Sequence, residues 1–132
     1  MGIDHQDPPK RIRLILIDDE AGFTTVMAKR LSRRGLDVTS AFSGSEAIQA
    51  MRKAEFDVAV LDLKMEDMDG IEVLKIFKKL DPGMPVIMLT GHGSEKSASE
   101  GMQYGAFDYL FKPCEFEELL KKIREAVSSP KK

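Results

Sequence analysis

Hydrophobic and polar positions follow two alternating patterns along the chain. Short runs that are almost wholly apolar alternate with longer segments whose apolar residues recur every three or four positions. The short runs predict buried strands, and the periodic segments predict amphipathic helices. We predict strands at 12–17, 37–41, 57–61, 85–89 and 107–111, with a helix after each. Repeated strand–helix units predict one α/β domain, a (βα)5 doubly wound five-stranded parallel sheet.

Capping signals place the ends of several helices. Ser43 and Glu46 have the spacing of a capping box at the start of the second helix. The first helix is predicted to stop near Gly35, because glycine readily takes the left-handed conformation that ends a helix. The fourth helix, at about 94–104, contains several serines and Gly101, which are poor helix formers. We therefore expect it to be the most mobile helix.

Composition and charge narrow the class of protein. The chain is 42% hydrophobic and 32% charged with a formal net charge of −2, which gives no electrostatic reason to expect nucleic-acid binding. No apolar run approaches the roughly 20 residues that span a bilayer, and the polar N-terminus does not resemble a signal peptide. A single cysteine fits a reducing compartment. We expect a cytoplasmic protein without a membrane partner: one domain over 11–127, with flexible ends at 1–10 and 128–132.

Chemically distinctive side chains stand where four of the predicted strands end. In an open parallel sheet the carboxyl ends of the strands share one edge, where ligands bind. These residues are Asp18, Asp19 and Glu20 after the first strand, Asp62 after the third, Thr90 after the fourth and Lys112 after the fifth. One acid at a strand end is usually a helix cap. The joint occurrence of these residue types in one short domain instead predicts a functional site.

The charges of this group constrain its chemistry. Asp18, Asp19 and Asp62 would repel one another and raise their pKa values unless a cation joined them, and Lys112 alone cannot balance three carboxylates. Mg²⁺ prefers such oxygen ligands together with water and phosphate. Carboxylates, magnesium and a fixed lysine point to phosphoryl transfer. Asp62 is the candidate nucleophile, because an aspartate can form an acyl phosphate. Thr90 and Lys112 are the candidate partners of the new phosphoryl group.

These residues resemble the receiver domain of bacterial two-component response regulators, the CheY-like family. The resemblance covers 12 to about 127 and rests on four motifs in order: LILIDDE, VLDLKMEDMDG, PVIMLTGHG and GAFDYLFKP. It implies a flavodoxin-like sheet with strand order 2-1-3-4-5. It also implies a signalling switch, phosphorylated by a sensor histidine kinase or a phosphotransfer protein. Such a receiver is not an enzyme for another substrate and catalyses only its own phosphotransfer and autodephosphorylation.

The resemblance also assigns the metal and phosphate residues. Asp62 matches the phosphoacceptor and Asp19 the direct Mg²⁺ ligand, with Asp18 acting through a bridging water. The backbone carbonyl of Lys64 would complete the protein's share of the coordination. Lys112 matches the lysine that pairs with the phosphoryl group, and its bond to the following proline is expected to be cis.

By the same resemblance, Thr90 and Tyr109 match a coupled switch pair, in which the hydroxyl moves toward the phosphoryl group and the ring turns inward. Lys64 and His92 would tune the phosphate lifetime. Glu66 stands where the family commonly has proline, and we expect a looser, more acidic loop there. The readout is expected on the surface of helix four, strand five and helix five, which would contact another receiver or a downstream effector.

Three alternatives remain open at this point. A phosphohydrolase with Asp62 as nucleophile would want an acid two residues later, where Lys64 stands. A flavodoxin-like FMN carrier shares the fold, but it needs a hydroxyl- and glycine-rich loop after the first strand, and the acidic residues there would repel phosphate. A degenerate, purely structural receiver is opposed by the presence of the acidic, threonine and lysine residues together.

Overall fold

Five strands and five helices alternate along the chain, as the periodicity predicts. The computed structural model describes residues 11–91 and 95–129. The elements, in chain order, are β1 (Arg13–Ile17), α1 (Ala21–Arg33), β2 (Asp37–Ala41), α2 (Gly44–Lys53), β3 (Val58–Asp62), α3 (Gly70–Leu80), β4 (Val86–Thr90), α4 (Glu95–Gln103), β5 (Asp108–Phe111) and α5 (Phe116–Ser128).

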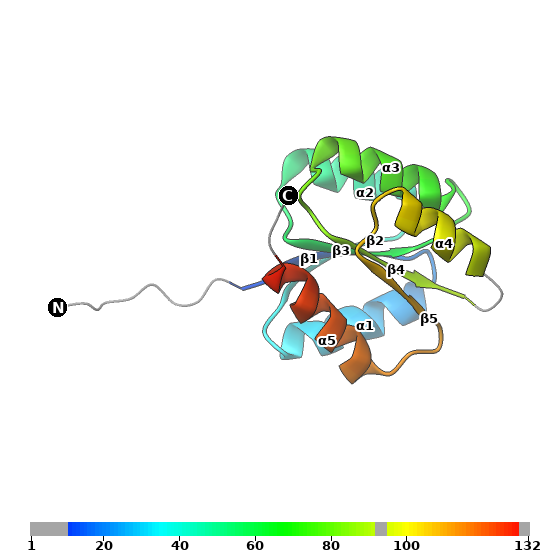
Figure 1. Cartoon of the computed structure of the whole chain (residues 1–132). Helices are drawn as coiled ribbons and strands as arrows, with labels where there is room; N and C mark the ends of the chain where they lie inside the picture. Colours follow the sequence, from blue (N-terminus) through cyan, green and yellow to red (C-terminus); the bar gives the residue numbers. More distant parts are fainter. Residues whose placement is uncertain (1–10, 92–94, 130–132) are drawn as a thin grey trace.

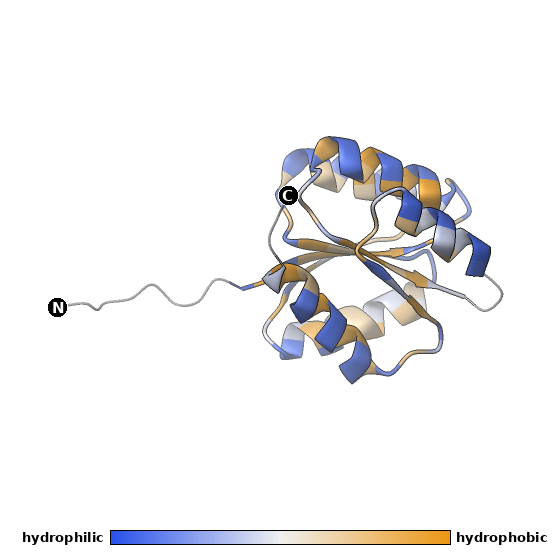
Figure 2. Cartoon of the chain, viewed as in Figure 1, coloured by the Kyte–Doolittle hydropathy of each residue, from blue (hydrophilic) through white to orange (hydrophobic). Residues whose placement is uncertain are grey.

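The strands form one parallel sheet in the order β2-β1-β3-β4-β5, which confirms the expected topology (Figure 1). Helices α1 and α5 cover one face of the sheet, and α2, α3 and α4 cover the other. The strands therefore bury side chains on both faces, and β3 and β4 are buried along their whole length. Figure 2 shows the apolar sheet enclosed between helices whose outer faces are polar.

Alternate side chains of each central strand pack into two separate hydrophobic cores, one on each face of the sheet. In β1, Ile15 and Ile17 pack toward α2 and α3, whereas Leu14 and Leu16 pack toward α1 and α5. This follows from the period of two in an extended chain. The sheet is thus a rigid, fully packed base, and whatever lies at its carboxyl edge is held in place by two cores.

Strands β3 and β4 run one residue further than their sequence pattern predicted. Asp62 and Thr90 are the last residues of these strands and not the first residues after them. Ladder pairing extends through both positions, because Asp62 lies opposite Leu89 and Thr90 lies opposite Phe111. Their backbones are therefore fixed by the sheet.

The predicted helix ends are confirmed. The Ser43 hydroxyl accepts a hydrogen bond from the Glu46 amide at 3.1 Å, as in a capping box. Gly35 follows α1 with φ of +93°, the left-handed conformation that favours glycine. In α4, Gly101 is buried against Met88 of β4, and a Cβ at this position would overlap the Met88 thioether. The glycine that weakens this helix therefore lets it approach the sheet.

Some predictions fall on other parts of the chain. Positions 1–10, 130–132 and His92 lie outside the described residues, so the extension, most of the tail and the role of His92 stay predictions. Helix α5 continues to Ser128, one residue past the predicted domain end. Within the described ranges, no helix has the length and apolar character needed to cross a membrane.

Candidate functional site

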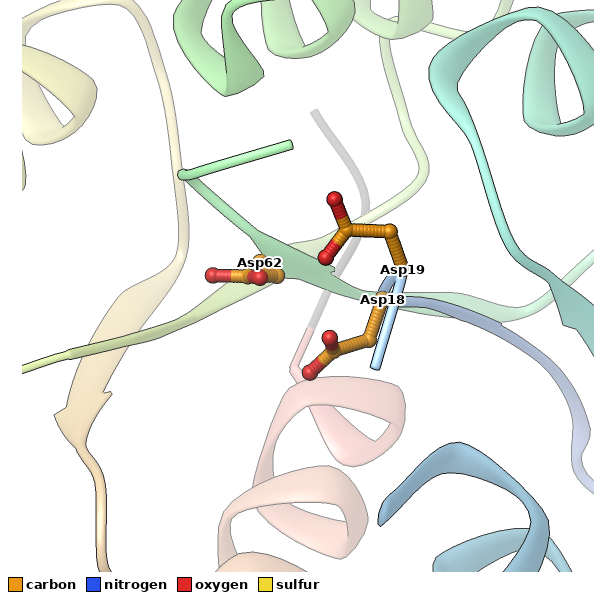
Figure 3. Close-up of side chains that lie close together, drawn as sticks. All are labelled: Asp18, Asp19 and Asp62. Atoms are coloured by element: carbon orange, nitrogen blue, oxygen red, sulfur yellow. The ribbon is translucent and has the colours of Figure 1, made fainter. Parts of the chain in front are cut away.

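Three carboxylates meet at the carboxyl edge of the sheet. Asp18 and Asp19 follow β1, and Asp62 ends the neighbouring strand β3. One oxygen of each carboxylate lies within 4.8 Å of the other two, and Figure 3 shows the three side chains gathered in one place. Asp18 and Asp62 are buried, with 1% and 6% of their surface exposed. This separation allows a single cation to bind all three.

Backbone and hydroxyl groups fix the two acids that follow β1. The Glu20 amide donates to Asp18 Oδ1 at 3.0 Å, and the Thr24 hydroxyl donates to the Asp18 carbonyl at 2.9 Å. The Glu66 amide donates to Asp19 Oδ2 at 3.0 Å. A proline at position 66 could not make this last bond, because it has no amide hydrogen. Glu66 therefore ties its loop to the acidic cluster, which the expectation of a looser loop did not foresee.

Lys112 brings the one ammonium group that contacts this cluster in the described part of the chain. Its Nζ lies 2.6 Å from Asp18 Oδ2, 2.9 Å from Glu20 Oε1 and 4.0 Å from Asp62 Oδ2. Burial alone would lower the pKa of Lys112, but the hydrogen bonds to Asp18 and Glu20 and the nearby charges outweigh burial and raise it. The group is therefore a permanent cation. The Lys112–Pro113 peptide bond is cis, as predicted.

The acceptor candidate Asp62 is electrostatically strained. Burial and then the charge of Asp18 raise its pKa from 3.8 to about 6, against the opposing effects of the Lys64 amide and the Lys112 ammonium. The Lys64 amide donates to Asp62 Oδ1 at 3.2 Å. One ammonium does not offset the charges of this carboxylate cluster, so a hard divalent cation fits the donor set.

A buried hydroxyl lies at the end of the adjacent strand β4. Thr90 is fully buried at the end of β4, and its Oγ1 finds no hydrogen-bond partner among the described residues. A buried polar group is normally paired, so this hydroxyl is an exception within the described part of the chain. Tyr109 is 38% exposed, and its ring packs edge-on against Phe111 with 5.2 Å between centroids. The ring therefore points outward in this structure.

The acidic loop after Asp62 has a structural task that the sequence interpretation missed. Asp67 accepts hydrogen bonds from the Gly44 amide at 2.9 Å and from the Ser45 amide and hydroxyl at 3.1 and 3.0 Å. The two amide bonds lower the pKa of Asp67. Asp69 caps α3 by accepting from the Ile71 amide at 2.9 Å. Two of the loop acids are thus exposed helix caps and not merely a solvated run.

The structure brings together four of the residues predicted for the site, Asp18, Asp19, Asp62 and Lys112, from the ends of β1, β3 and β5. The Lys64 amide contacts this cluster through Asp62, and Thr90 ends the adjacent strand β4. Tyr109 lies outside the cluster on the exposed side of β5. Glu20 was noticed in the sequence but had no role there, and its contact with Lys112 spans 92 residues. No local pattern could have revealed that contact.

Comparison with known proteins identifies relatives over nearly the whole chain. The family model of the response regulator receiver domain matches residues 14–124. The transcriptional regulatory protein GlrR of Escherichia coli K12 is 36% identical over 118 residues, covering 89% of this chain and 27% of GlrR. The luminescence regulatory protein LuxO of Vibrio campbellii is 34% identical over 112 residues, covering 85% of this chain and 25% of LuxO. The chain thus spans about a quarter of these relatives.

Solved structures agree with the sequence relatives. A CheY-like receiver domain protein from Methanospirillum hungatei has a TM-score of 0.87 at 31% identity, covering 90% of this chain and 95% of that one. The receiver domain of NtrX from Brucella abortus has a TM-score of 0.85 at 28% identity, covering 89% of this chain and 99% of that one. The chain therefore belongs to the response regulator receiver domain family, whose members are phosphorylation-dependent signalling switches.

Proposed function

We propose that this chain receives a phosphoryl group on the Asp62 carboxylate from a sensor histidine kinase or a phosphotransfer protein. The observation that carries the proposal is the convergence of the buried Asp62 with Asp18, Asp19 and the Lys112 ammonium, with Thr90 at the end of the adjacent strand β4. An FMN carrier would place its phosphate against the acids after β1, which would repel it. A purely structural receiver gives no reason to keep a strained Asp62 beside a buried unpaired hydroxyl.

The transfer is a displacement at phosphorus. One Asp62 oxygen forms the new O–P bond, while the N–P bond of the donor phosphohistidine breaks and its electron pair returns to the imidazole. Lys112, already 4.0 Å from Asp62, pairs with a phosphoryl oxygen, and the Thr90 hydroxyl donates to another. The strand end fixes Asp62 for this step, so little reorganisation is needed. Water later hydrolyses the acyl phosphate, and we assign the tuning of its lifetime to Lys64 and His92.

The carboxylate cluster fits a bound Mg²⁺. We assign Asp19 and Asp62 as direct ligands, the backbone carbonyl of Lys64 as a third and Asp18 as a ligand through water. The bound metal would supply charge neutralisation for the acids and for the transferring phosphoryl group. Because an added cation favours the ionised form of Asp62, a bound Mg²⁺ would counteract the raised pKa and keep the carboxylate ionised at lower pH.

Incubation with Mg²⁺ and a small acyl-phosphate donor should add one phosphoryl group to the protein. Asp62→Asn should abolish the labelling, because the amide is a poor nucleophile, and a chelator should abolish it by removing the metal. Intact-protein mass spectrometry measures the product. Asp37→Asn is the matched control, because this exposed aspartate begins β2 at the opposite edge of the sheet. Labelling that survives in Asp62→Asn would overturn the assignment of the acceptor.

The output is a change at the surface formed by α4, β5 and α5, driven by Thr90 and Tyr109. The Thr90 hydroxyl has no partner among the described residues and the Tyr109 ring is exposed, which supports a change at these two residues. This surface would contact a second receiver or a downstream effector. GlrR is a transcriptional regulator, but for this chain such an effector is part of the proposal.

Thr90→Val should uncouple phosphorylation from α4. Phosphorylation of the wild type should change amide hydrogen exchange in α4, whereas the variant should be labelled on Asp62 yet show little change. The variant should also be more stable by about 1 kcal/mol, because valine removes an unpaired buried hydroxyl at nearly constant volume. Exchange in α4 that does not respond to wild-type phosphorylation would sink this part of the proposal.

A further inference from the structure

The Lys112 ammonium has an aromatic neighbour besides its carboxylate partners. Its Nζ lies 4.5 Å from the centroid of the Phe23 ring, within the range of a cation–π contact. The Lys112 side chain is only 18% exposed. Phe23 belongs to α1 and is half-buried against the core between that helix and the sheet. An aromatic face therefore forms one wall of the lysine site.

The carboxylate partners alone do not explain how this ammonium is held. Glu20 is 65% exposed on its side chain, and ion pairs with exposed partners are weak because water screens them. Asp18 is buried, but it is also a member of the acidic cluster and would be engaged there when a cation is present. The Phe23 ring is an uncharged contact, so neither a metal ion nor a phosphoryl group competes for it.

The geometry of the ring suits a cation that has to move. Nζ lies 2.9 Å from Glu20 and 4.0 Å from Asp62, so an exchange of Glu20 for a phosphoryl oxygen on Asp62 would move the ammonium a short way within the site. A ring face attracts a cation over an area and not at one point, so the contact can persist during this shift. It also limits the many rotamers of the lysine chain, which reduces the entropy lost on pairing.

We propose that Phe23 is a positioning residue that holds the Lys112 ammonium within reach of the phosphoryl group on Asp62. The inference rests on the proposed phosphorylation of Asp62. Phe23 does not touch the reacting atoms in this scheme. It acts through Lys112, so its contribution should disappear when the lysine charge is removed.

Phe23→Leu should lower the rate constant of Asp62 phosphorylation, at saturating Mg²⁺ and acyl-phosphate donor, by about three- to tenfold. Leucine fills the apolar site but has no π face. Phe23→Tyr should restore most of the rate, because it keeps the ring. Phe42→Leu is the control, since Phe42 is an exposed phenylalanine of the β2–α2 connection. Thermal unfolding of each variant shows whether it is folded.

A double-mutant cycle separates positioning from structure. In a Lys112→Met background, Phe23→Leu should change the residual rate by less than about twofold, because coupled residues are not additive. If Phe23→Leu lowered the rate equally in the wild-type and Lys112→Met backgrounds, Phe23 would support only the fold. A wild-type rate in Phe23→Leu would also overturn the inference. A wild-type chain that is not labelled on Asp62 would instead overturn the proposed function on which the inference rests.

Discussion

Gly70→Ala is expected to lower the free energy of unfolding by about 3 kcal/mol. Gly70 opens α3 and lies directly against the backbone that follows Asp62. An added Cβ would overlap the Leu63 Cα and lie 2.8 Å from the Leu63 carbonyl oxygen and 2.9 Å from the Asp62 carbonyl oxygen. These are main-chain atoms of a buried segment, so no side chain can rotate away to relieve the overlap. Urea denaturation, followed by circular dichroism, measures the loss.

The same substitution at Gly22 is the matched control. Gly22 lies in the first turn of α1 with nothing within 4 Å of an added Cβ. Gly22→Ala should therefore stabilise the domain by up to about 1 kcal/mol through the higher helix propensity of alanine. If Gly70→Ala were as stable as the wild type, the close approach of α3 to the Asp62 loop would be wrong. A loss of stability in Gly70→Ala together with a gain in Gly22→Ala would show that packing, and not helix propensity, determines the effect at Gly70.

The overlap at Gly70 also reaches the functional site. The backbone that has to move includes residues 62–63, which join the acceptor to Lys64. The Gly70 amide donates to the Leu63 carbonyl at 3.0 Å, so helix start and acceptor loop are one structural unit. A stability loss at this position should therefore be accompanied by slower labelling of Asp62.

The sequence predicts the parts of the fold that depend on local patterns. Nearly continuous apolar strands, the Ser43 cap and the left-handed Gly35 each reflect a preference that acts within a few residues. The cap and the glycine are found where predicted, and the strands lie within one residue of their predicted bounds. Asp62 and Thr90 were placed one residue outside their strands. In the sequence, a polar residue after an apolar run suggests that the strand has ended. In the structure, backbone pairing with the neighbouring strand includes these polar residues.

The contacts that complete the site depend on distant residues or on the main chain. Lys112 meets Glu20 and Phe23 across the sheet edge, and nothing in the local sequence at any of the three indicates a contact. The amide of Glu66 donates to Asp19, whereas its residue type predicted only a looser, more acidic loop. Asp67 is recognisable as a cap only once α2 is known to begin beside it. Residue types thus predict which groups form the site, whereas the contacts that hold these groups in place are visible only in the tertiary structure.

Asp62→Asn should stabilise the metal-free domain by about 2–3 kcal/mol at pH 7.5, and this gain should vanish as the pH falls toward 4. The folded state raises the pKa of Asp62 from 3.8 to about 6, chiefly through burial and then through Asp18. An acid with a raised pKa binds more protons in the folded state, so its ionisation opposes folding as the pH rises through this window. The penalty is complete above pH 6 and absent below 3.8, and each pKa unit is worth about 1.4 kcal/mol.

Urea denaturation in a chelating buffer at several pH values measures the difference between the variant and the wild type. Subtracting the two curves cancels the titration of acids that do not interact with Asp62, such as Asp67 and Asp108, whose pKa values are lowered. Asp37→Asn should change stability by less than about 0.5 kcal/mol throughout, as for an ordinary surface site. Mg²⁺ should stabilise the wild type more than Asp62→Asn, because binding favours the folded state that retains the ligand. A stability gain in Asp62→Asn that does not depend on pH would mean that packing, and not the charge of Asp62, lowers the stability of the wild type. The electrostatic strain that we ascribe to Asp62 would then be absent.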